Sequence, residues 1–280
     1  MDKKTAIVTG ANRGFGLLCS IELACKGYHV LATMRDTRKA EKLVKTAKLR
    51  ETDRHITIMQ LDVTSETSIH DFKEGLTKYS SIDLLLNNAG YALGGFAEEV
   101  SIEEFREQFE TNVFGVMAVT QAVLPFMRQQ GYGKILNMSS ISGRFGFPGL
   151  SPYAASKHAL EGYSESLRFE LKPFGIDVFL IEPGSYKTNI WTSGMKVATR
   201  SLDKESPYYT YLKRIETELE NGRDRLGDPA EIAALVGEIA VGNKTAFRIP
   251  AGKGTRGMIY IKSILPWGML EKMIRRKLNM

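Results

Sequence analysis

The sequence predicts a doubly wound α/β fold, in which a parallel sheet is covered by helices on both faces. Short apolar runs alternate with segments of helical periodicity through most of the 280 residues. Strands separated by helices of this length form right-handed crossovers within a parallel sheet. Residues 82–86 are apolar at every position but one, as a sheet covered on both sides requires. No linker rich in proline, glycine or serine divides the chain.

The elements are expected in regular alternation. The apolar runs predict strands at residues 5–9, 29–34, 55–61, 82–87, 134–138, 176–181 and 247–249. The helical periodicity predicts helices at residues 15–26, 38–48, 65–79, 101 to about 129, 152–173 and 229–241. Gly27 ends the first helix, Ser101 and Glu104 form a capping box, and Asp228 precedes a proline at a first helical position.

The composition is typical of a globular protein, with 43% hydrophobic and 25% charged residues. Cys19 and Cys25 fall on different faces of the first predicted helix, so we expect no disulfide between them, as in a cytoplasmic protein. The first residues lack the apolar stretch of a signal peptide. No uncharged run approaches the ~18 residues of a membrane-spanning helix. The four histidines form no ligand-like cluster, and we expect no metal site.

The net charge of +6 comes from one end of the chain. Residues 253–280 hold seven basic side chains and one acidic side chain, whereas the rest of the chain holds 31 of each. We therefore expect no nucleic-acid-binding face. Within residues 266–280 an apolar arc lies opposite basic side chains; its members are Trp267, Leu270, Met273, Ile274 and Leu278, opposite Lys272, Arg275 and Arg276. Such a helix packs on the body or on a second subunit, or lies on an anionic membrane surface.

The first strand leads directly into the loop Thr9-Gly10-Ala11-Asn12-Arg13-Gly14-Phe15-Gly16, and a helix follows. Glycine allows a tight turn and close approach of the backbone to a pyrophosphate. The following helix offers free N–H groups to the phosphate. Glycines also occur in ordinary turns, but this loop lies at the first strand-to-helix junction, where a dinucleotide-binding fold requires it.

These and later motifs resemble the short-chain dehydrogenase/reductase family, most closely its hydroxysteroid and retinol dehydrogenase branch. The motifs appear in the family's order: the glycine loop, Asn87-Asn88-Ala89-Gly90, Ser140, Tyr153, Lys157 and Pro183-Gly184. The resemblance covers residues 1 to about 245. It implies one Rossmann-type domain at residues 1–250, which includes a substrate segment at 188–221. Residues 251–280 would form a basic amphipathic extension rather than a separate domain.

The resemblance implies four catalytic residues: Tyr153, Lys157, Ser140 and Asn112. Tyr153 and Lys157 are four residues apart on a predicted helix and share one face. An ammonium group favours the phenolate and lowers the tyrosine pKa from about 10, which suits proton exchange with a carbonyl oxygen. Ser140 would hydrogen-bond that oxygen, with Ser142 as the less well spaced alternative. By resemblance, Asn112 would hold a water that relays protons to Lys157.

The cofactor would lie along the same edge of the sheet. By resemblance, Asp62 and Val63 flank adenine, and Pro183 to Thr188 flank the nicotinamide. The full set implied is Gly10, Asn12, Arg13, Gly14, Phe15, Gly16, Arg35, Asp62, Val63, Asn88, Ala89, Gly90, Tyr153, Lys157, Pro183, Gly184, Tyr186 and Thr188.

The end of the second strand predicts a preference for NADP(H) over NAD(H). In the family pattern, Met34 stands where NAD-dependent enzymes carry an acid that binds the ribose 2′-hydroxyl. Arg35 and Arg13 could instead bind a 2′-phosphate. In the alternative interpretation, Asp36 accepts from the ribose and Arg13 is a solvated loop residue.

The segment at 188–221 predicts an apolar substrate, although packing within a lid would explain the same composition. Its large side chains are Trp191, Met195, Tyr208, Tyr209 and Tyr211, and the preceding loop adds Phe147 and Leu150. We expect an oxidoreductase that transfers hydride between NADPH and a ketone or aldehyde, steroid- or retinoid-like. A 3-oxoacyl-thioester reductase is the alternative, and a non-catalytic dinucleotide sensor a further one. By resemblance, we expect a homodimer or homotetramer.

Overall fold

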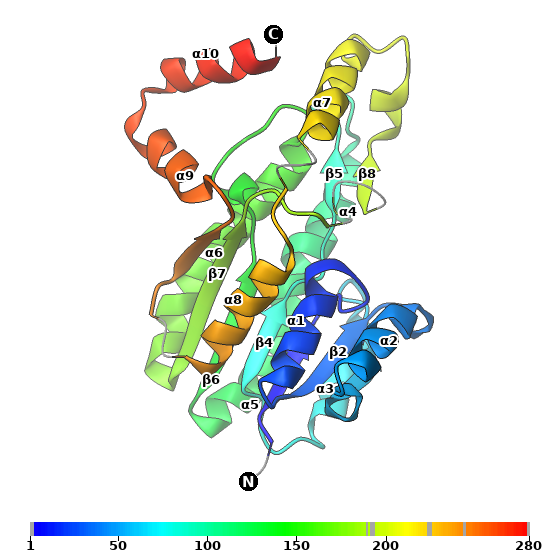
Figure 1. Cartoon of the computed structure of the whole chain (residues 1–280), viewed down its shortest axis with the longest axis vertical. Coiled ribbons are helices and arrows are strands. Elements are labelled where there is room, and N and C mark those ends of the chain that lie inside the picture. The colour runs from blue at the N-terminus through cyan, green and yellow to red at the C-terminus, as the bar shows by residue number, and fades with distance from the viewer. Residues whose placement is uncertain (1–2, 189, 191–193, 223–225, 243–244, 279–280) are drawn as a thin grey trace.

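The computed structural model describes residues 3–188, 190, 194–222, 226–242 and 245–278. A parallel seven-stranded sheet runs through it in the order β3-β2-β1-β4-β6-β7-β9 (Figure 1). Its strands are β1 (Thr5–Val8), β2 (His29–Met34), β3 (Ile56–Gln60), β4 (Leu84–Asn87), β6 (Gly133–Met138), β7 (Ile176–Pro183) and β9 (Arg248–Ala251). The predicted doubly wound Rossmann-type sheet is confirmed.

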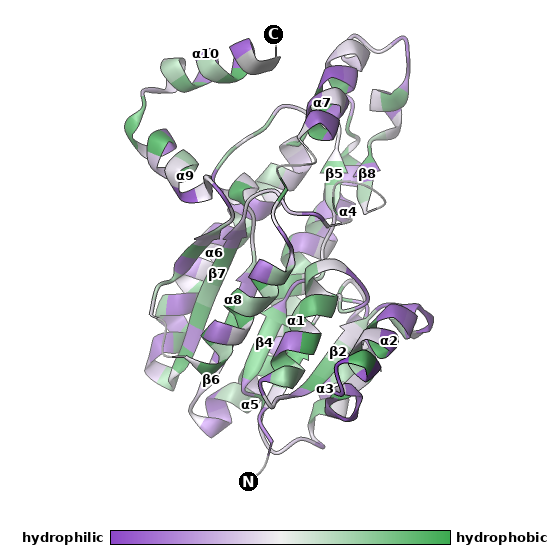
Figure 2. Ribbon diagram, viewed as in Figure 1, coloured by the Kyte–Doolittle hydropathy of each residue, from purple (hydrophilic) through white to green (hydrophobic). Residues whose placement is uncertain are grey.

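Helices cover both faces of this sheet (Figure 1). One face packs against α1 (Gly14–Cys25), α2 (Glu41–Leu49) and α8 (Ala230–Val241), and the other against α3 (Glu66–Leu76), α5 (Gly115–Gln130) and α6 (Ser151–Leu171). Successive residues of a strand point to opposite faces, so Ala6 and Val8 enter one core and Ile7 the other. Figure 2 shows the resulting green interior and the purple outer faces of the helices.

The long helix expected from Ser101 to about Gln129 is present as one helical run, but a π-helical turn inside it divides the run into two α-helical parts. The capping box is present, and Ser101 begins α4 (Ile102–Phe109). A π-helical turn, Glu110–Phe114, then separates α4 from α5. The side chain of Asn112, inside this turn, hydrogen-bonds the backbone of Tyr91 on a distant loop. Apolar periodicity cannot reveal such a turn, because it shifts the helical register by a single residue.

A small second layer lies above the carboxyl ends of the strands. The short strands β5 (Ala92–Gly94) and β8 (Met195–Val197) pair in parallel, and α7 (Tyr209–Asn221) follows. Leu93, Val100 and Ala198 form its small core. This layer contains most of the described part of the substrate segment, and its elements were not among those predicted.

The chain ends in two helices beyond the sheet. They are α9 (Thr255–Ile264) and α10 (Trp267–Leu278), and the second confirms the amphipathic helix expected after Pro266. Both lie at the end of the molecule opposite the N-terminus (Figure 1). The division at residue 250 stays a prediction. None of the helices described is long and apolar enough to span a membrane.

Candidate active site

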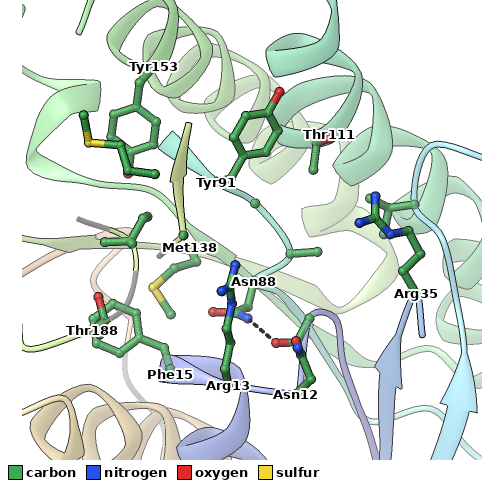
Figure 3. A pocket seen from close by; sticks show the side chains of 18 of the residues that line it. Asn12, Arg13, Phe15, Arg35, Asn88, Tyr91, Thr111, Met138, Tyr153 and Thr188 are labelled. Atoms are coloured by element: carbon green, nitrogen blue, oxygen red, sulfur yellow. Dashed lines mark hydrogen bonds between the residues drawn. The ribbon is translucent and has the colours of Figure 1, made fainter. Parts of the chain in front are cut away.

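A cavity of about 950 Å³ opens at the carboxyl ends of the strands. It lies beside β1, where the strand order reverses, because β2 pairs on one side of β1 and β4 on the other. Ligands of doubly wound sheets bind at such a switch point. Figure 3 shows Arg35 on one side of the cavity, Tyr153 and Thr188 on the other, and Asn88 between them. The cavity therefore has the position and the length expected for a dinucleotide together with a substrate.

The glycine loop packs without room for side chains. Gly10 has a φ of +67°, and a Cβ on Gly16 would lie 2.3 Å from the carbonyl oxygen of Gly10. The hydroxyl of Thr9 accepts from the backbone N–H groups of Asn88 and Ala89, both at 2.9 Å. Helix α1 starts at Gly14, and no side chain caps it. Its first N–H groups are therefore free to meet an anion at the cavity floor.

Three cations line the end of the cavity beyond β2. They are Arg13, Arg35 and Lys39, and all three are exposed and without an ion pair among the described residues. The carboxylate of Asp36 also lines the cavity, but it accepts from Arg38 Nε at 2.8 Å and Nη2 at 3.1 Å. These hydrogen bonds hold the pKa of Asp36 below its ordinary value. Lys39 was not among the predicted residues; its position in the turn after Arg35 is the signal for it.

The third strand contributes Asp62 and Val63 to the same wall. The carboxylate of Asp62 accepts from the backbone N–H of Thr64 at 3.0 Å and from its hydroxyl at 2.8 Å. Asp62 is therefore a turn residue as well as a cavity residue.

Ser140, Tyr153 and Lys157 meet at the other end of the cavity. The hydroxyl of Ser140 hydrogen-bonds Tyr153. Lys157 Nζ donates to the carbonyl oxygen of Met138 at 2.7 Å and lies 5.7 Å from the centre of the Tyr153 ring. Both side chains are buried, with 3% of Tyr153 and 7% of Lys157 exposed. The structure thus brings the three predicted groups together at one end of the cavity.

Burial controls the protonation of this pair. It raises the pKa of Tyr153 to about 12, although the bond from Ser140 acts in the other direction. It lowers the pKa of Lys157 to about 8, which the negative charge of Glu161 partly offsets. The sequence predicted a lowered tyrosine pKa, and the structure corrects this for the protein alone, because the loss of solvent on burial outweighs the hydrogen bond from Ser140.

Two predicted residues lie behind the cavity wall. Asn112 is 1% exposed and accepts from Tyr91 N at 3.2 Å, while its Nδ2 donates to Tyr91 O at 3.0 Å and Ser156 Oγ at 3.3 Å. Gly16 packs on Gly10 rather than on the cavity. The water relay through Asn112 stays a prediction.

The loop after β7 lines the cavity with Pro183, Gly184 and Thr188. Tyr186 lines the cavity too, but the residue is only 2% exposed and its hydroxyl donates to Glu231 at 3.3 Å. It meets the ring of Phe15 edge-on, at 5.5 Å between centres. Tyr186 therefore packs mainly against its neighbours, and its contact with the nicotinamide stays a prediction.

The substrate segment at 188–221, which we call the lid, and the loop before Tyr153 contribute fewer aromatic side chains to the cavity than their composition suggested. Met195 lines the cavity, whereas Tyr208 stacks on Phe96 at 4.6 Å between ring centres. Tyr209, Tyr211, Phe147 and Leu150 are also absent from the lining, and Trp191 lies outside the described residues. Packing within the lid therefore explains most of these residues.

Several lining residues were not predicted. The substrate side includes Tyr91, Met138, Ile190 and Lys196. Tyr91 directly follows the Asn87–Gly90 motif, and Met138 ends β6 two residues before Ser140. Tyr91 and Met138 could have been predicted from the sequence, because each lies beside a motif at the end of a strand.

A buried charge network supports the catalytic end from behind. Glu182 precedes Pro183, and its Oε1 accepts from Arg144 Nη1 at 3.1 Å. Glu161 lies one helical turn after Lys157; it accepts from Ser139 Oγ at 2.5 Å and from Arg248 Nε at 3.0 Å. Burial, followed by the charge of Glu161, raises the pKa of Glu182 to about 7. Within the described part of the chain, no group of His, Cys, Asp and Glu is placed to hold a metal.

Known proteins resemble this chain over most of its length. The family model "short chain dehydrogenase" matches residues 4–197. An uncharacterized oxidoreductase of Bacillus subtilis, YusZ, is 49% identical over 279 residues and covers 99% of both chains. A 3-ketodihydrosphingosine reductase of Bacteroides thetaiotaomicron is 33% identical over 280 residues and covers 98% of both. The crystal structure of a short-chain dehydrogenase from Streptomyces avermitilis superposes with a TM-score of 0.81 at 32% identity, covering 100% of this chain and 98% of that one.

Proposed function

Because the chain belongs to the short-chain dehydrogenase/reductase family and is an NAD(P)-dependent oxidoreductase acting on CH–OH groups, we propose that it reduces apolar ketones or aldehydes with NADPH. The reverse oxidation of the alcohol uses the same groups. The observation that carries the cofactor preference is the set of cations at the β2 end, Arg13, Arg35 and Lys39. Guanidinium groups bind phosphate in bidentate geometry, whereas Asp36 is already engaged by Arg38.

The glycine loop fits a dinucleotide by its shape. Its close backbone packing and the uncapped start of α1 leave N–H groups for a pyrophosphate, and Asn88 to Gly90 border the same space. The nicotinamide supplies hydride when it is bound. Thr188 and Pro183 border the end of the cavity where Tyr153 lies, so this is where we place the reacting carbon.

Tyr153 is the proton donor in this proposal. Burial raises the pKa of Tyr153 to about 12, so its hydroxyl carries a proton for the carbonyl oxygen throughout the neutral range. A positive charge beside the hydroxyl opposes this rise and eases the release of the proton. Ser140 bonds the same oxygen and steadies its developing charge. Lys157 carries its charge below about pH 8, and this ammonium favours the phenolate needed in the oxidative direction. Asn112 keeps the wall in place through its bonds to Tyr91 and Ser156.

The proposal of an apolar substrate rests on the lining beyond Tyr153. The large side chains that line the cavity there are Tyr91, Met138, Ile190 and Met195, and the cation Lys196 lies beside them. Methionine adapts to irregular apolar shapes, so a chain or a fused ring would fit. The relative named for reducing 3-ketodihydrosphingosine supports a ketone as the reacting group.

We also propose a cytoplasmic homodimer or homotetramer. Two large apolar side chains are exposed near the helices that flank the site: Phe114 in the π-helical turn (52%) and Phe169 on α6 (74%). Burial of these rings against a second copy would stabilise the assembly.

Fluorescence titration with NADPH and NADH tests the cofactor preference. We expect NADPH to bind at least tenfold more tightly, about 1.4 kcal/mol, and Arg35→Ala to remove the difference. Arg50→Ala is the matched control, because Arg50 is an exposed arginine beyond the end of α2 that does not line the cavity. Equal or tighter binding of NADH would overturn the preference and point to Asp36 as the ribose acceptor.

A further inference from the structure

The two C-terminal helices expose apolar side chains that the body of the protein does not cover. Six of them are between 42% and 66% exposed: Met258, Ile261, Ile264, Trp267, Met269 and Met273. Patches of this kind on a soluble protein mark a surface that meets another apolar phase. Figure 1 shows α9 and α10 projecting from the end of the molecule at which the strands terminate, and Figure 2 shows apolar green on both.

The exposed side chains form continuous faces. On α9, Met258, Ile261 and Ile264 recur every three residues and therefore lie along one side of the helix. On α10, Leu270 is buried, and the helix contacts α7. Met269 and Met273, one turn apart, form the outer edge of the same apolar arc. One part of the apolar arc of α10 is therefore buried, and another part is exposed.

Basic side chains border these faces. Lys253, Arg256, Lys272 and Arg276 are exposed and have no ion pair among the described residues. Arg275 has a partner in Glu271, at 4.0 Å between exposed groups. Such a pair at the surface contributes little. The surface therefore combines apolar side chains with an excess of positive charge.

Lys262 anchors this surface to the body. Its ammonium hydrogen-bonds the carbonyl oxygen of Arg144 and lies 5.0 Å from the centre of the Phe145 ring. The start of α9 is held as well, because the Thr255 hydroxyl donates to Ala251 O at 3.0 Å. The helices are consequently presented in a defined position relative to the sheet.

We propose that α9 and α10 dock the protein on an anionic lipid bilayer. The apolar side chains would enter the boundary between headgroups and acyl chains, and the basic side chains would meet lipid phosphates. Charge favours this occupant over a second copy of the chain. The rest of the protein holds 31 basic and 31 acidic side chains, so it offers no net negative charge to match the positive tail.

The docking surface lies at the same end of the molecule as the cavity. Strand β9 is parallel to β7, so α9 leaves the sheet at the carboxyl edge, where the cavity also opens. A docked protein would hold this edge close to the bilayer, and a lipid-dissolved substrate would have a short path to Tyr153. The docking itself does not rest on the proposed reaction, because the helices and their charges are independent of the cavity.

Cosedimentation of the full chain with vesicles tests the proposal without cofactor or substrate. We expect binding to vesicles of equal phosphatidylcholine and phosphatidylglycerol, and weak binding to phosphatidylcholine alone. The double variant Lys272→Glu, Arg276→Glu should bind the anionic vesicles about tenfold less tightly or worse. Lys48→Glu with Arg50→Glu is the matched control, since these exposed cations lie at the end of α2. Binding should also weaken in 0.5 M salt, because salt screens surface charges.

Fluorescence of Trp267 provides a second readout. In a Trp191→Phe background Trp267 is the remaining tryptophan, so a blue shift on adding anionic vesicles would report its entry into the lipid. Unchanged NADPH affinity would show that each variant is folded. The proposal is overturned if anionic vesicles bind no better than neutral ones, or if charge reversal on α10 leaves binding unchanged. It is also overturned if the wild type does not bind anionic vesicles and light scattering shows that Trp267→Ala dissociates an oligomer.

Discussion

The two ends of the cavity are built in different ways. The nucleotide end consists of the loops 9–16 and 87–90, which fit together through backbone atoms and glycines. The catalytic end consists of Ser140, Tyr153 and Lys157, supported by the buried acids Glu161 and Glu182. The first end depends on close approach and the second on buried charge. At the nucleotide end, cofactor affinity should therefore fall when a substitution adds a side-chain atom. At the catalytic end, activity and stability should change when a substitution removes a group that gives or holds a proton.

Removal of one hydroxyl at the catalytic end should have the largest effect. We expect Tyr153→Phe to lower kcat for carbonyl reduction by roughly 10²–10⁴-fold, because the phenylalanine ring cannot donate the proton that we assign to the Tyr153 hydroxyl. NADPH affinity should change little, since the phenyl ring still fills its place. Tyr163→Phe, on the same helix and away from the cavity lining, should retain activity. A wild-type protein that binds NADPH but turns over no carbonyl in a broad panel would favour the dinucleotide sensor.

A single methyl group should disable the nucleotide end. In Gly16→Ala the Cβ would lie 2.3 Å from Gly10 O and 2.5 Å from Asn88 Nδ2, so the loop must shift. We expect cofactor affinity to fall by roughly tenfold or more, about 1.4 kcal/mol. Gly162→Ala is the matched substitution on α6, where a Cβ would meet nothing within 4 Å. It should keep affinity and stabilise the helix by about 0.5–1 kcal/mol. Equal affinities for the two variants in a titration would contradict the close packing.

The last prediction concerns the pH dependence of stability at the catalytic end. The folded protein holds the proton of Glu182 up to about pH 7, whereas the unfolded chain releases it near its ordinary pKa of 4.5. The native state therefore binds more protons between these values, and its stability falls as pH rises through them. The Glu182→Gln variant has no carboxyl at this position, so it does not lose stability in this way. The free energy of unfolding of the variant, relative to that of the wild type, should therefore increase from pH 5 to pH 8. We expect about 1–2 kcal/mol after solvent screening, measurable by urea unfolding. A constant difference across this range would argue that Glu182 is ionised throughout.

Sequence and structure agree best where a motif is local. The loop from Thr9 to Gly16 and the pair Tyr153 and Lys157 are short segments whose spacing already implies a turn or a shared helix face. The structure brings both to one cavity. The lid agreed less well. Tyr208 is apolar enough to suggest a substrate contact, yet it stacks on Phe96, more than a hundred residues earlier in the chain. Composition alone cannot tell these two partners apart.

The sequence by itself determined the succession of the sheet's strands and of the helices between them, the glycine loop, the candidate catalytic residues and the concentration of charge in the tail. The elements follow from periodicity, which the local chain dictates, and the catalytic residues follow from the resemblance of short motifs to a known family. Only the tertiary structure decided the π-helical turn at Asn112, the shifted pKa values of Tyr153 and Glu182, and which apolar side chains of α9 and α10 stay uncovered. Each of these depends on contacts between segments far apart in the chain and on the loss of solvent that those contacts impose.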